Sequence, residues 1–209
     1  MHARAVKHLR ERDPQLREWI DRIGLVRLPQ RPSTDPFLAL LESIAHQQLA
    51  GAAARAIWNR VLALFEDQLP RPERILALSE EHLRGAGLSR SKALSMKDIA
   101  ATAIAGQLPD AQRIMKMSEL EILEQLTKIR GVGPWTVDML LIFTLRRPDI
   151  MPLTDYGVRK GFQVLYRKRS LPTPKQLSKG AERWRPYRTA AALYLWRIAD
   201  AKERSTLTS

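Results

Sequence analysis

Hydrophobic residues recur at helical spacing along most of the chain, and no segment of useful length alternates with period two. The stretch 52–68 shows the pattern, with Ala56, Val61, Leu64 and Phe65 at positions that one helical face can share. Similar patterns predict helices within 13–24, 35–51, 71–88 (as two short helices), 89–106, 110–117, 118–129, 134–147, 155–168, 173–184 and 186–202. The sequence therefore predicts an all-α fold with almost no sheet.

Start and stop signals support several of these helices. Asp–Pro pairs begin the segments 13–24 and 35–51, which we expect to end at Gly24 and Gly51. Ser118 and Glu121 have the spacing of a capping box, in which each side chain bonds the other residue's backbone N–H. The Pro-containing stretch 28–36 is the best candidate linker, and a second break lies at 146–152.

Composition narrows the class of protein. The 209 residues contain no run of eighteen apolar positions, so no transmembrane helix is expected, and the charged N-terminus lacks the apolar core of a signal peptide. The absence of cysteine excludes disulfides, cysteine-ligated zinc, iron–sulfur clusters and a cysteine nucleophile, and it fits a reducing cytosol. The net charge of +13 attracts polyanions, which makes nucleic acid the leading partner. A merely basic surface, or one that meets anionic membranes or acidic proteins, is the alternative.

The segment 126–141, "LTKIRGVGPWTVDMLL", interrupts a helical pattern with Gly131, Gly133 and Pro134 and resumes it at once. Glycines let the backbone approach a ligand closely, and the N–H groups of the second helix would face the turn. A phosphate group could bind there through main-chain atoms alone, without regard to base sequence. A simple tight corner is the alternative.

The same segment, followed by "MPLTDYGVRKGF", resembles the helix-hairpin-helix DNA glycosylases with their Gly/Pro loop and downstream aspartate. The stretches "LLESIAHQQLAGAAA", "GLSRSKALSMKDIA" and "AERWRPYRTAAALYLWR" resemble matching blocks of the DNA-3-methyladenine glycosylase II family, which excises alkylated bases. The resemblance covers roughly residues 33 to 200, in a short form without the N-terminal sheet domain of larger members.

This resemblance implies a two-lobed fold with the active site in the interdomain cleft. Residues 1–34 would form an N-terminal helix and linker that pack with the C-terminal lobe. Residues 35–147 would form a helical bundle containing the helix-hairpin-helix at about 119–146. Residues 148–209 would supply the C-terminal helices, which carry the catalytic aspartate and complete the second lobe.

The resemblance places the catalytic carboxylate at Asp155. A carboxylate can stabilise the positive charge that develops on the sugar and can orient or deprotonate the attacking water. An N-cap for the helix that follows is the alternative role, and one aspartate can serve both. Asp138 lies inside the preceding helix and is interpreted as structural. Relatives that also cut the strand carry a lysine nucleophile where this chain has Trp135, so we expect a monofunctional enzyme.

An alkylated purine carries a positive charge and leaves readily, so it needs an electron-rich pocket more than a general acid. The family's pocket positions fall on Trp135, Tyr156 and Trp196, and a further one, often Tyr, is Met139. On its own, Trp196 in "YLWRI" also fits a plain core residue.

DNA contacts are expected in three places. Gly131 and Gly133 would bind phosphate, and the family's wedge position falls on Gln48 with Leu49 beside it, although Gln47 and Gln48 could simply end a helix. Phosphate contacts at a helix start are expected from these residues: Ser89, Arg90 and Lys92.

No cofactor is expected to be required, but the resemblance implies a possible Na⁺ or K⁺ ion at the main-chain carbonyls of Thr127, Ile129 and Gly131. The expected partner is double-stranded DNA containing alkylated bases, with no membrane, for a cytoplasmic monomer. Two alternatives stay open: a glycosylase of the same fold for uracil, hypoxanthine or an oxidised base, and a non-catalytic DNA-binding module.

Overall fold

The computed structural model describes residues 2–28, 34–49 and 51–207, and within these ranges it contains helices and no strand. The all-α prediction is therefore confirmed. The helices are α1 (His2–Arg12), α2 (Pro14–Ile23), α3 (Pro36–His46), α4 (Gly51–Leu62), α5 (Pro72–Ala77), α6 (Glu80–Gly85), α7 (Arg90–Ile104), α8 (Ala111–Lys116), α9 (Glu119–Leu126), α10 (Pro134–Met139), the π-helical η1 (Leu140–Thr144), α11 (Tyr156–Leu165), α12 (Pro174–Ala181), the 3₁₀ helix η2 (Glu182–Trp184) and α13 (Arg188–Leu207).

The chain divides into two compact units. Unit 1 combines Met1–Gln30 with Arg146–Ser209, and unit 2 is Arg31–Leu145. The boundaries therefore fall beside the two breaks that the proline-containing segments predict. The cleft expected between the lobes stays a prediction.

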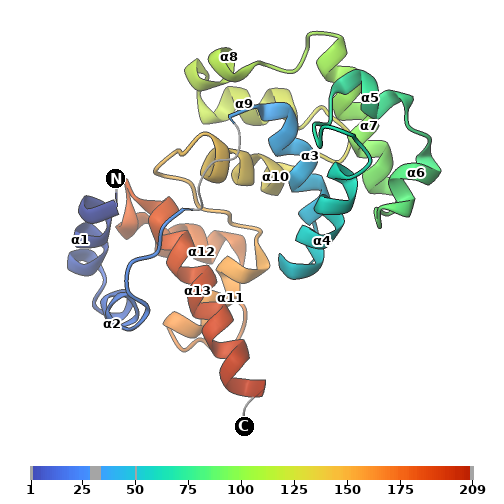
Figure 1. The fold of residues 1–209 in the computed structure, drawn as a ribbon. Coiled ribbons are helices and arrows are strands. Elements are labelled where there is room, and N and C mark those ends of the chain that lie inside the picture. Colours follow the sequence, from blue (N-terminus) through green and yellow to red (C-terminus); the bar gives the residue numbers. More distant parts are fainter. Residues whose placement is uncertain (1, 29–33, 50, 208–209) are drawn as a thin grey trace. The chain divides into compact units, whose positions relative to one another are not determined.

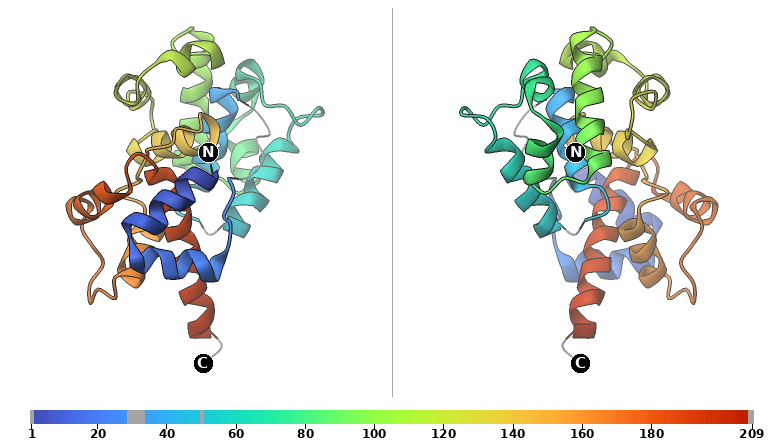
Figure 2. Two further views of the ribbon diagram at one scale, coloured as in Figure 1. Left: turned by 90° about the vertical axis from the view of Figure 1, so that its left-hand side faces the viewer. Right: turned by 90° about the vertical axis from the view of Figure 1, so that its right-hand side faces the viewer.

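Unit 1 is built on α11 and α13, which lie side by side along much of their length (Figure 1). Gly161 permits this contact, since a Cβ atom there would lie 2.0 Å from the carbonyl oxygen of Leu195. Helices α1 and α2 pack against α13, as the views in Figure 2 also show. The N-terminal segment thus belongs with the C-terminal helices.

A buried carboxylate ties α2 into this unit. Asp13, 1% exposed, caps α2 by accepting a hydrogen bond from Leu16 N. Its Oδ2 atom also accepts hydrogen bonds from the Tyr166 hydroxyl and from Trp184 Nε1. Burial, together with the hydrogen bond to Asp13, raises the pKa of Tyr166 above its usual range. Asp13, which the sequence predicts only as a helix start, therefore also links α2 to Tyr166 and to Trp184 of η2.

Helix α1 corrects the sequence-based prediction, which placed a single helix in this region. The segment 2–12 is dominated by charged side chains, and its fully buried residues are Ala5 and Leu9. Two apolar residues four positions apart do not make a recognisable stripe. Packing against α13 and η2, rather than the helix's own pattern, accounts for its place in the fold.

In unit 2, α3 packs against α4, α7, α10 and η1. Helices α5 and α6 pack on α7, and apolar residues of α3 and α7, such as Leu40, Ile44, Met96 and Ile99, are fully buried. The capping box of Ser118 and Glu121 at the start of α9 is confirmed. These helices form the framework that holds the hairpin between α9 and α10 (Figure 1).

Several helix ends differ from the prediction; α13, for example, continues to Leu207, beyond the predicted range. Helix α3 ends at His46 rather than at Gly51, which instead begins α4. The helix after Pro134 changes to a π-helical turn at Leu140. At the end of α3, Gln47 is the C-cap, which confirms the alternative considered from the sequence, and the Lys92 ammonium binds the carbonyl oxygens of Ala45 and Gln47 at 3.0 and 2.7 Å.

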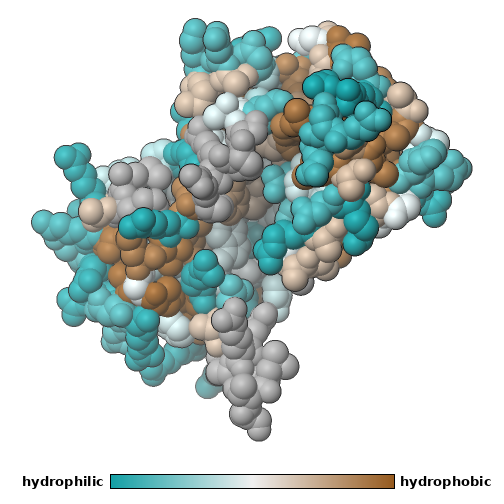
Figure 3. Space-filling view, viewed as in Figure 1, coloured by the Kyte–Doolittle hydropathy of each residue, from teal (hydrophilic) through white to brown (hydrophobic). Residues whose placement is uncertain are grey.

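In the view of Figure 3, hydrophilic residues cover much of the surface, with hydrophobic patches among them. Within the described ranges, no helix combines the length and the hydropathy that crossing a membrane requires.

Candidate functional site

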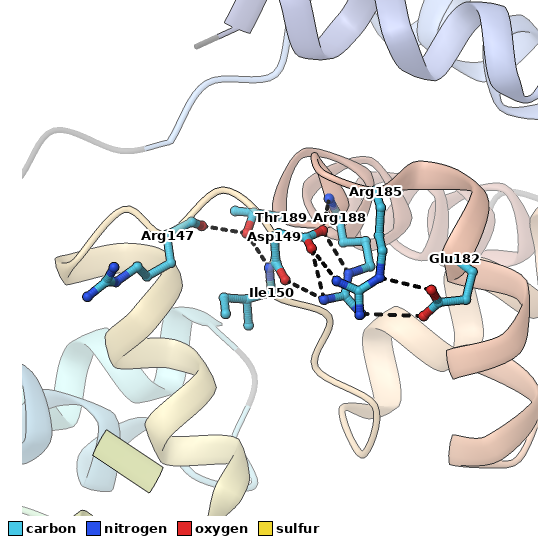
Figure 4. Close-up of polar contacts among 7 residues, drawn as sticks. All are labelled: Arg147, Asp149, Ile150, Glu182, Arg185, Arg188 and Thr189. Atoms are coloured by element: carbon cyan, nitrogen blue, oxygen red, sulfur yellow. Dashed lines mark hydrogen bonds and ion pairs between the residues drawn. The ribbon is translucent and has the colours of Figure 1, made fainter. Parts of the chain in front are cut away.

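The segment that leads to Asp155 is held by a cluster of polar contacts (Figure 4). Asp149 accepts hydrogen bonds from Arg188 Nε at 2.8 Å and from Arg185 Nη1 at 2.6 Å. Thr189 accepts a hydrogen bond from Ile150 N and donates one to Arg147 O. The start of α13 thus fixes residues 147–150, and with them the approach to the candidate catalytic residue.

Asp155 is the N-cap of α11, and its Oδ1 atom accepts a hydrogen bond from Val158 N at 2.8 Å. The same oxygen accepts a second hydrogen bond, also of 2.8 Å, from Trp196 Nε1 on α13. The side chain is half-buried. The capping role considered from the sequence is therefore confirmed, and a second element orients the carboxylate as well.

Trp196 is half-buried, and its indole N–H is committed to Asp155, so it is more than a core residue. Gly157 makes room for it, because a Cβ atom there would lie 2.8 Å from Trp196 Cδ1 and 3.3 Å from Asp155 Oδ1. Tyr156 is 61% exposed at the start of α11. Unit 1 thus brings Trp196 of α13 to the carboxylate of Asp155, and Tyr156 directly follows Asp155 in the chain.

The hairpin of unit 2 is packed tightly against α7. Gly131 has a φ of +77°, and a Cβ atom there would lie 2.1 Å from Ser95 Oγ. Arg130 N donates a hydrogen bond to Asp98 Oδ2 at 2.9 Å. Helix α10 begins at Pro134 with no side-chain cap at Gly133. A rigid turn before an uncapped helix start is the arrangement that phosphate binding through main-chain N–H groups needs.

The loop between α3 and α4 carries the predicted wedge. Gln48 and Leu49 are exposed, and Gln48 has a φ of +57°, in the left-handed region. Gln47 joins this loop to the hairpin, because its Nε2 atom donates to Gly131 O at 2.9 Å and to Thr136 Oγ1 at 3.0 Å. The structure therefore places the predicted wedge and the predicted phosphate-binding turn beside each other.

The predicted phosphate contacts at the start of α7 have different surroundings. Ser89 caps the helix by accepting a hydrogen bond from Lys92 N, and the exposed Arg90 forms an ion pair with Glu80 at 3.3 Å. Lys92 binds two main-chain carbonyls, and burial lowers its pKa. These contacts favour an internal role for Lys92 over the predicted phosphate contact.

The remaining predicted residues lie in unit 2. Trp135 is half-buried and Met139 is buried, both on α10. Of the carbonyls proposed for a monovalent cation, that of Ile129 accepts a hydrogen bond from Val132 N, and that of Gly131 accepts one from Gln47. An ion would have to share these oxygens with two hydrogen bonds, so we assign it no step in the mechanism.

Several supporting residues went unrecognised in the sequence: Gln47 as a link, Ser95 and Asp98 beneath the hairpin, and Gly157 beneath Trp196. Each contacts a residue more than thirty positions away in the chain, so no local spacing could have revealed that contact. Gly157 also lies close to Asp155, two positions before it. Two of the supporting residues stood next to a predicted residue, Gln47 beside Gln48 and Gly157 beside Tyr156.

Comparison with known proteins agrees with these features. The model of the family "HhH-GPD superfamily base excision DNA repair protein" matches residues 41–186.

A Schizosaccharomyces pombe protein named DNA-3-methyladenine glycosylase 1 is 39% identical, over 92% of this chain and 85% of its own. The solved structure of a 3-methyladenine DNA glycosylase from the same yeast, in complex with abasic DNA, has a TM-score of 0.89 at 38% identity and covers 93% of this chain and 96% of that one. A second yeast relative, "Alkylbase DNA glycosidase-like protein mag2", is 34% identical over 94% of this chain and 93% of its own. The chain belongs to the HhH-GPD superfamily of base excision DNA repair proteins.

Proposed function

We propose that this protein is a monofunctional DNA glycosylase that hydrolyses the N-glycosyl bond of alkylated purines in duplex DNA and leaves an abasic site. The observation that carries the proposal is the carboxylate of Asp155, oriented by Trp196 Nε1 and Val158 N in a member of a base excision repair family. The names of the yeast relatives support 3-methyladenine as a substrate, and the DNA-bound relative supports DNA as the partner.

Asp155 acts on the sugar. As the bond to the base breaks, its electron pair leaves with the base and positive charge develops on the deoxyribose. A carboxylate that is already oriented stabilises this charge without having to reorganise. Water then adds to C1′ and loses a proton, which Asp155 can accept directly or pass to solvent. Oδ1 is held by two donors, so the anion stays in one orientation while the charge forms.

The choice of alkylated purines follows from the leaving group. A purine methylated at N3 or N7 is already cationic and departs as a neutral base, so it needs no general acid. Aromatic faces attract such a cation. We propose Tyr156 and Trp196 of unit 1 as residues that contact the base; the family's other aromatic position, Trp135, and the position taken by Met139 stay predictions from the resemblance.

The hairpin and the wedge act on the DNA. Main-chain N–H groups around Gly131 and Gly133 bind the phosphate backbone, and Gln48, with Leu49 beside it, fills the space that the extruded base vacates. Trp135 stands at the position of the strand-cutting lysine and cannot form a Schiff base, so the reaction ends at the abasic site.

The decisive variant is Asp155→Asn. Asparagine retains the N-cap, so folding survives, but the charge that faces the sugar is lost. Excision of 7-methylguanine should fall by roughly 10²- to 10⁴-fold while the affinity for DNA is retained. Asp110→Asn is the matched control, since Asp110 caps α8 through the N–H groups of Gln112 and Arg113 and should leave excision unchanged. Excision at the original rate by Asp155→Asn would refute the assigned role.

The substrate class needs a separate assay, in which excision is compared on duplexes containing 3-methyladenine, 7-methylguanine, hypoxanthine, ethenoadenine and uracil. We expect the two cationic bases to be released fastest. A preference for uracil would favour the alternative glycosylase, and binding without release of any base would favour the non-catalytic module.

A further inference from the structure

The amide of Gln47 connects two parts of unit 2 that have separate tasks in the proposed function. Its Nε2 atom donates one hydrogen bond to the Gly131 carbonyl within the hairpin and another to Thr136 Oγ1 in the first turn of α10. The next residue along the chain is Gln48, the predicted wedge. One side chain therefore joins the wedge loop to the turn that is proposed to grip the phosphate.

The loop is restrained from its other side as well. Lys92 Nζ donates to the carbonyls of Ala45 and Gln47 itself, at 3.0 and 2.7 Å. Gln48 occupies the left-handed region, with a φ of +57°, which non-glycine residues adopt at a cost of about 1–2 kcal/mol. Such a conformation persists only where the surroundings impose it. The surroundings here are the contacts of Gln47 and Lys92, together with a hydrogen bond from Leu49 N to His46 O that spans Gln48.

We propose that Gln47 is a positioning residue that couples the wedge to the phosphate-binding hairpin. This inference rests on the proposed function. Extruding a base requires the wedge to press into the stack, and unstacking costs a few kcal/mol. A loop attached only at its ends would yield to that load. The Gln47 amide transmits it to the hairpin, which is fixed on the DNA backbone, so that the wedge stays at the depth where the vacated space is filled.

The first test removes the link. Single-turnover excision of 7-methylguanine from duplex DNA, at saturating protein, should be about tenfold slower in Gln47→Ala, which corresponds to about 1.4 kcal/mol. Gln47→Glu should be slowed equally, because its carboxylate has the same shape but no hydrogen to donate to the Gly131 carbonyl. Affinity for undamaged duplex should stay within about twofold, since main-chain groups bind the phosphates.

Gln125→Ala is the matched control. The Gln125 amide also donates to a main-chain carbonyl, that of Gln107 at 2.7 Å, and it lies within the same unit. Its loss should leave excision unchanged. The melting temperatures of Gln47→Ala and Gln125→Ala should lie within about 4 °C of that of the unsubstituted protein. A slower reaction then reflects a loss of positioning and not a general loss of stability.

A double-variant comparison then separates positioning from plain structural support. If Gln47 acts by positioning the wedge, the variant Gln47→Ala/Gln48→Ala excises no more slowly than Gln48→Ala alone. Once the wedge side chain is gone, the loss of its positioning residue has no further effect. Additive defects, or an unchanged rate in Gln47→Ala, would overturn the proposal.

A failure of the proposed function has a different signature. If the original protein releases no base from any duplex, the glycosylase assignment fails. The coupling is then read from binding alone: the protein should prefer a duplex with a tetrahydrofuran abasic site over an undamaged one, and Gln47→Ala should lose that preference. Retention of the full preference would overturn the coupling in that case too.

Discussion

Gly157→Ala is the substitution that tests the Asp155–Trp196 pair most directly, because it adds a single methyl group beside it. A Cβ atom at residue 157 would lie 2.8 Å from Trp196 Cδ1 and 3.2 Å from its Nε1. Carbon atoms attract one another at about 3.5–4.0 Å, so the indole has to move away by about 0.7 Å or more. The hydrogen bond to Asp155 now measures 2.8 Å and would stretch towards the limit at which such a bond is lost.

The expected effect of Gly157→Ala on the excision rate is much larger than its effect on stability. A hydrogen bond to a charged group contributes about 1.5–3 kcal/mol, and losing its orienting effect should slow excision by roughly 10- to 100-fold. Replacing glycine by alanine inside a helix favours folding by up to about 1 kcal/mol, which offsets much of the steric cost. We therefore expect slow excision in a protein whose free energy of unfolding changes by less than about 1 kcal/mol.

The assay is single-turnover excision of 7-methylguanine together with urea unfolding. Trp196→Phe should lose a similar share of activity, because it keeps a ring but has no N–H to donate. Gly85→Ala at the end of α6 is the matched control, since a Cβ atom there meets nothing within 4 Å. If Gly157→Ala excises as fast as the original protein, the orientation of Asp155 by Trp196 does not matter for the reaction, and that part of the mechanism is wrong.

Three further predictions concern the hairpin, the reaction and the core. Gly131→Ala should lower the free energy of unfolding by about 1–3 kcal/mol and weaken DNA binding, because it combines a φ of +77° with a clash against Ser95; unchanged affinity in a binding titration would contradict this. Borohydride should trap no protein–DNA adduct, and an efficient adduct would refute our interpretation of Trp135. Burial and Asp13 raise the pKa of Tyr166 above 10.0, so at high pH the folded state keeps a proton that the unfolded chain loses. The free energy of unfolding, measured with urea, should therefore fall above about pH 10, and this pH dependence should be absent in Tyr166→Phe.

The sequence predicted helices where caps and apolar periodicity agree. The helix at 14–23 has both an aspartate start and a glycine stop, and the structure confirms both. The sequence-based prediction failed where contacts with distant segments determine whether a helix forms or where it ends. The end of α3 at His46 was considered only as an alternative, in which Gln47 and Gln48 end a helix, and the ammonium that binds there comes from Lys92, forty-five positions beyond Gln47. Likewise α1 is held by packing against α13 and η2, which the pattern of its own residues does not predict.

The candidate site shows the same division. Asp155, which is proposed to act on the sugar, was recognised by the resemblance to a family, whereas Gly131 was already indicated by the glycine break in a helical pattern. Trp196 was recognised as well, but its hydrogen bond to Asp155 requires knowledge of how α11 lies against α13. Gln47 had been considered only as a residue that ends a helix. Its two hydrogen bonds reach residues 84 and 89 positions away, beyond any pattern in the local sequence.

The hairpin of unit 2 and the surroundings of Asp155 in unit 1 share one structural feature: a neighbouring side chain fills the space that a glycine leaves open. Ser95 occupies the space beside Gly131, and Trp196 occupies the space beside Gly157. The usual explanation for a glycine in such a motif is backbone freedom or close approach to a ligand, and Gly131, with its positive φ, does need that freedom. No left-handed backbone is recorded for Gly157, so its reason is the space alone. A glycine beside a candidate catalytic aspartate can therefore mark the place where the residue that orients the carboxylate packs, so the packing partner, rather than the turn, is the feature to look for.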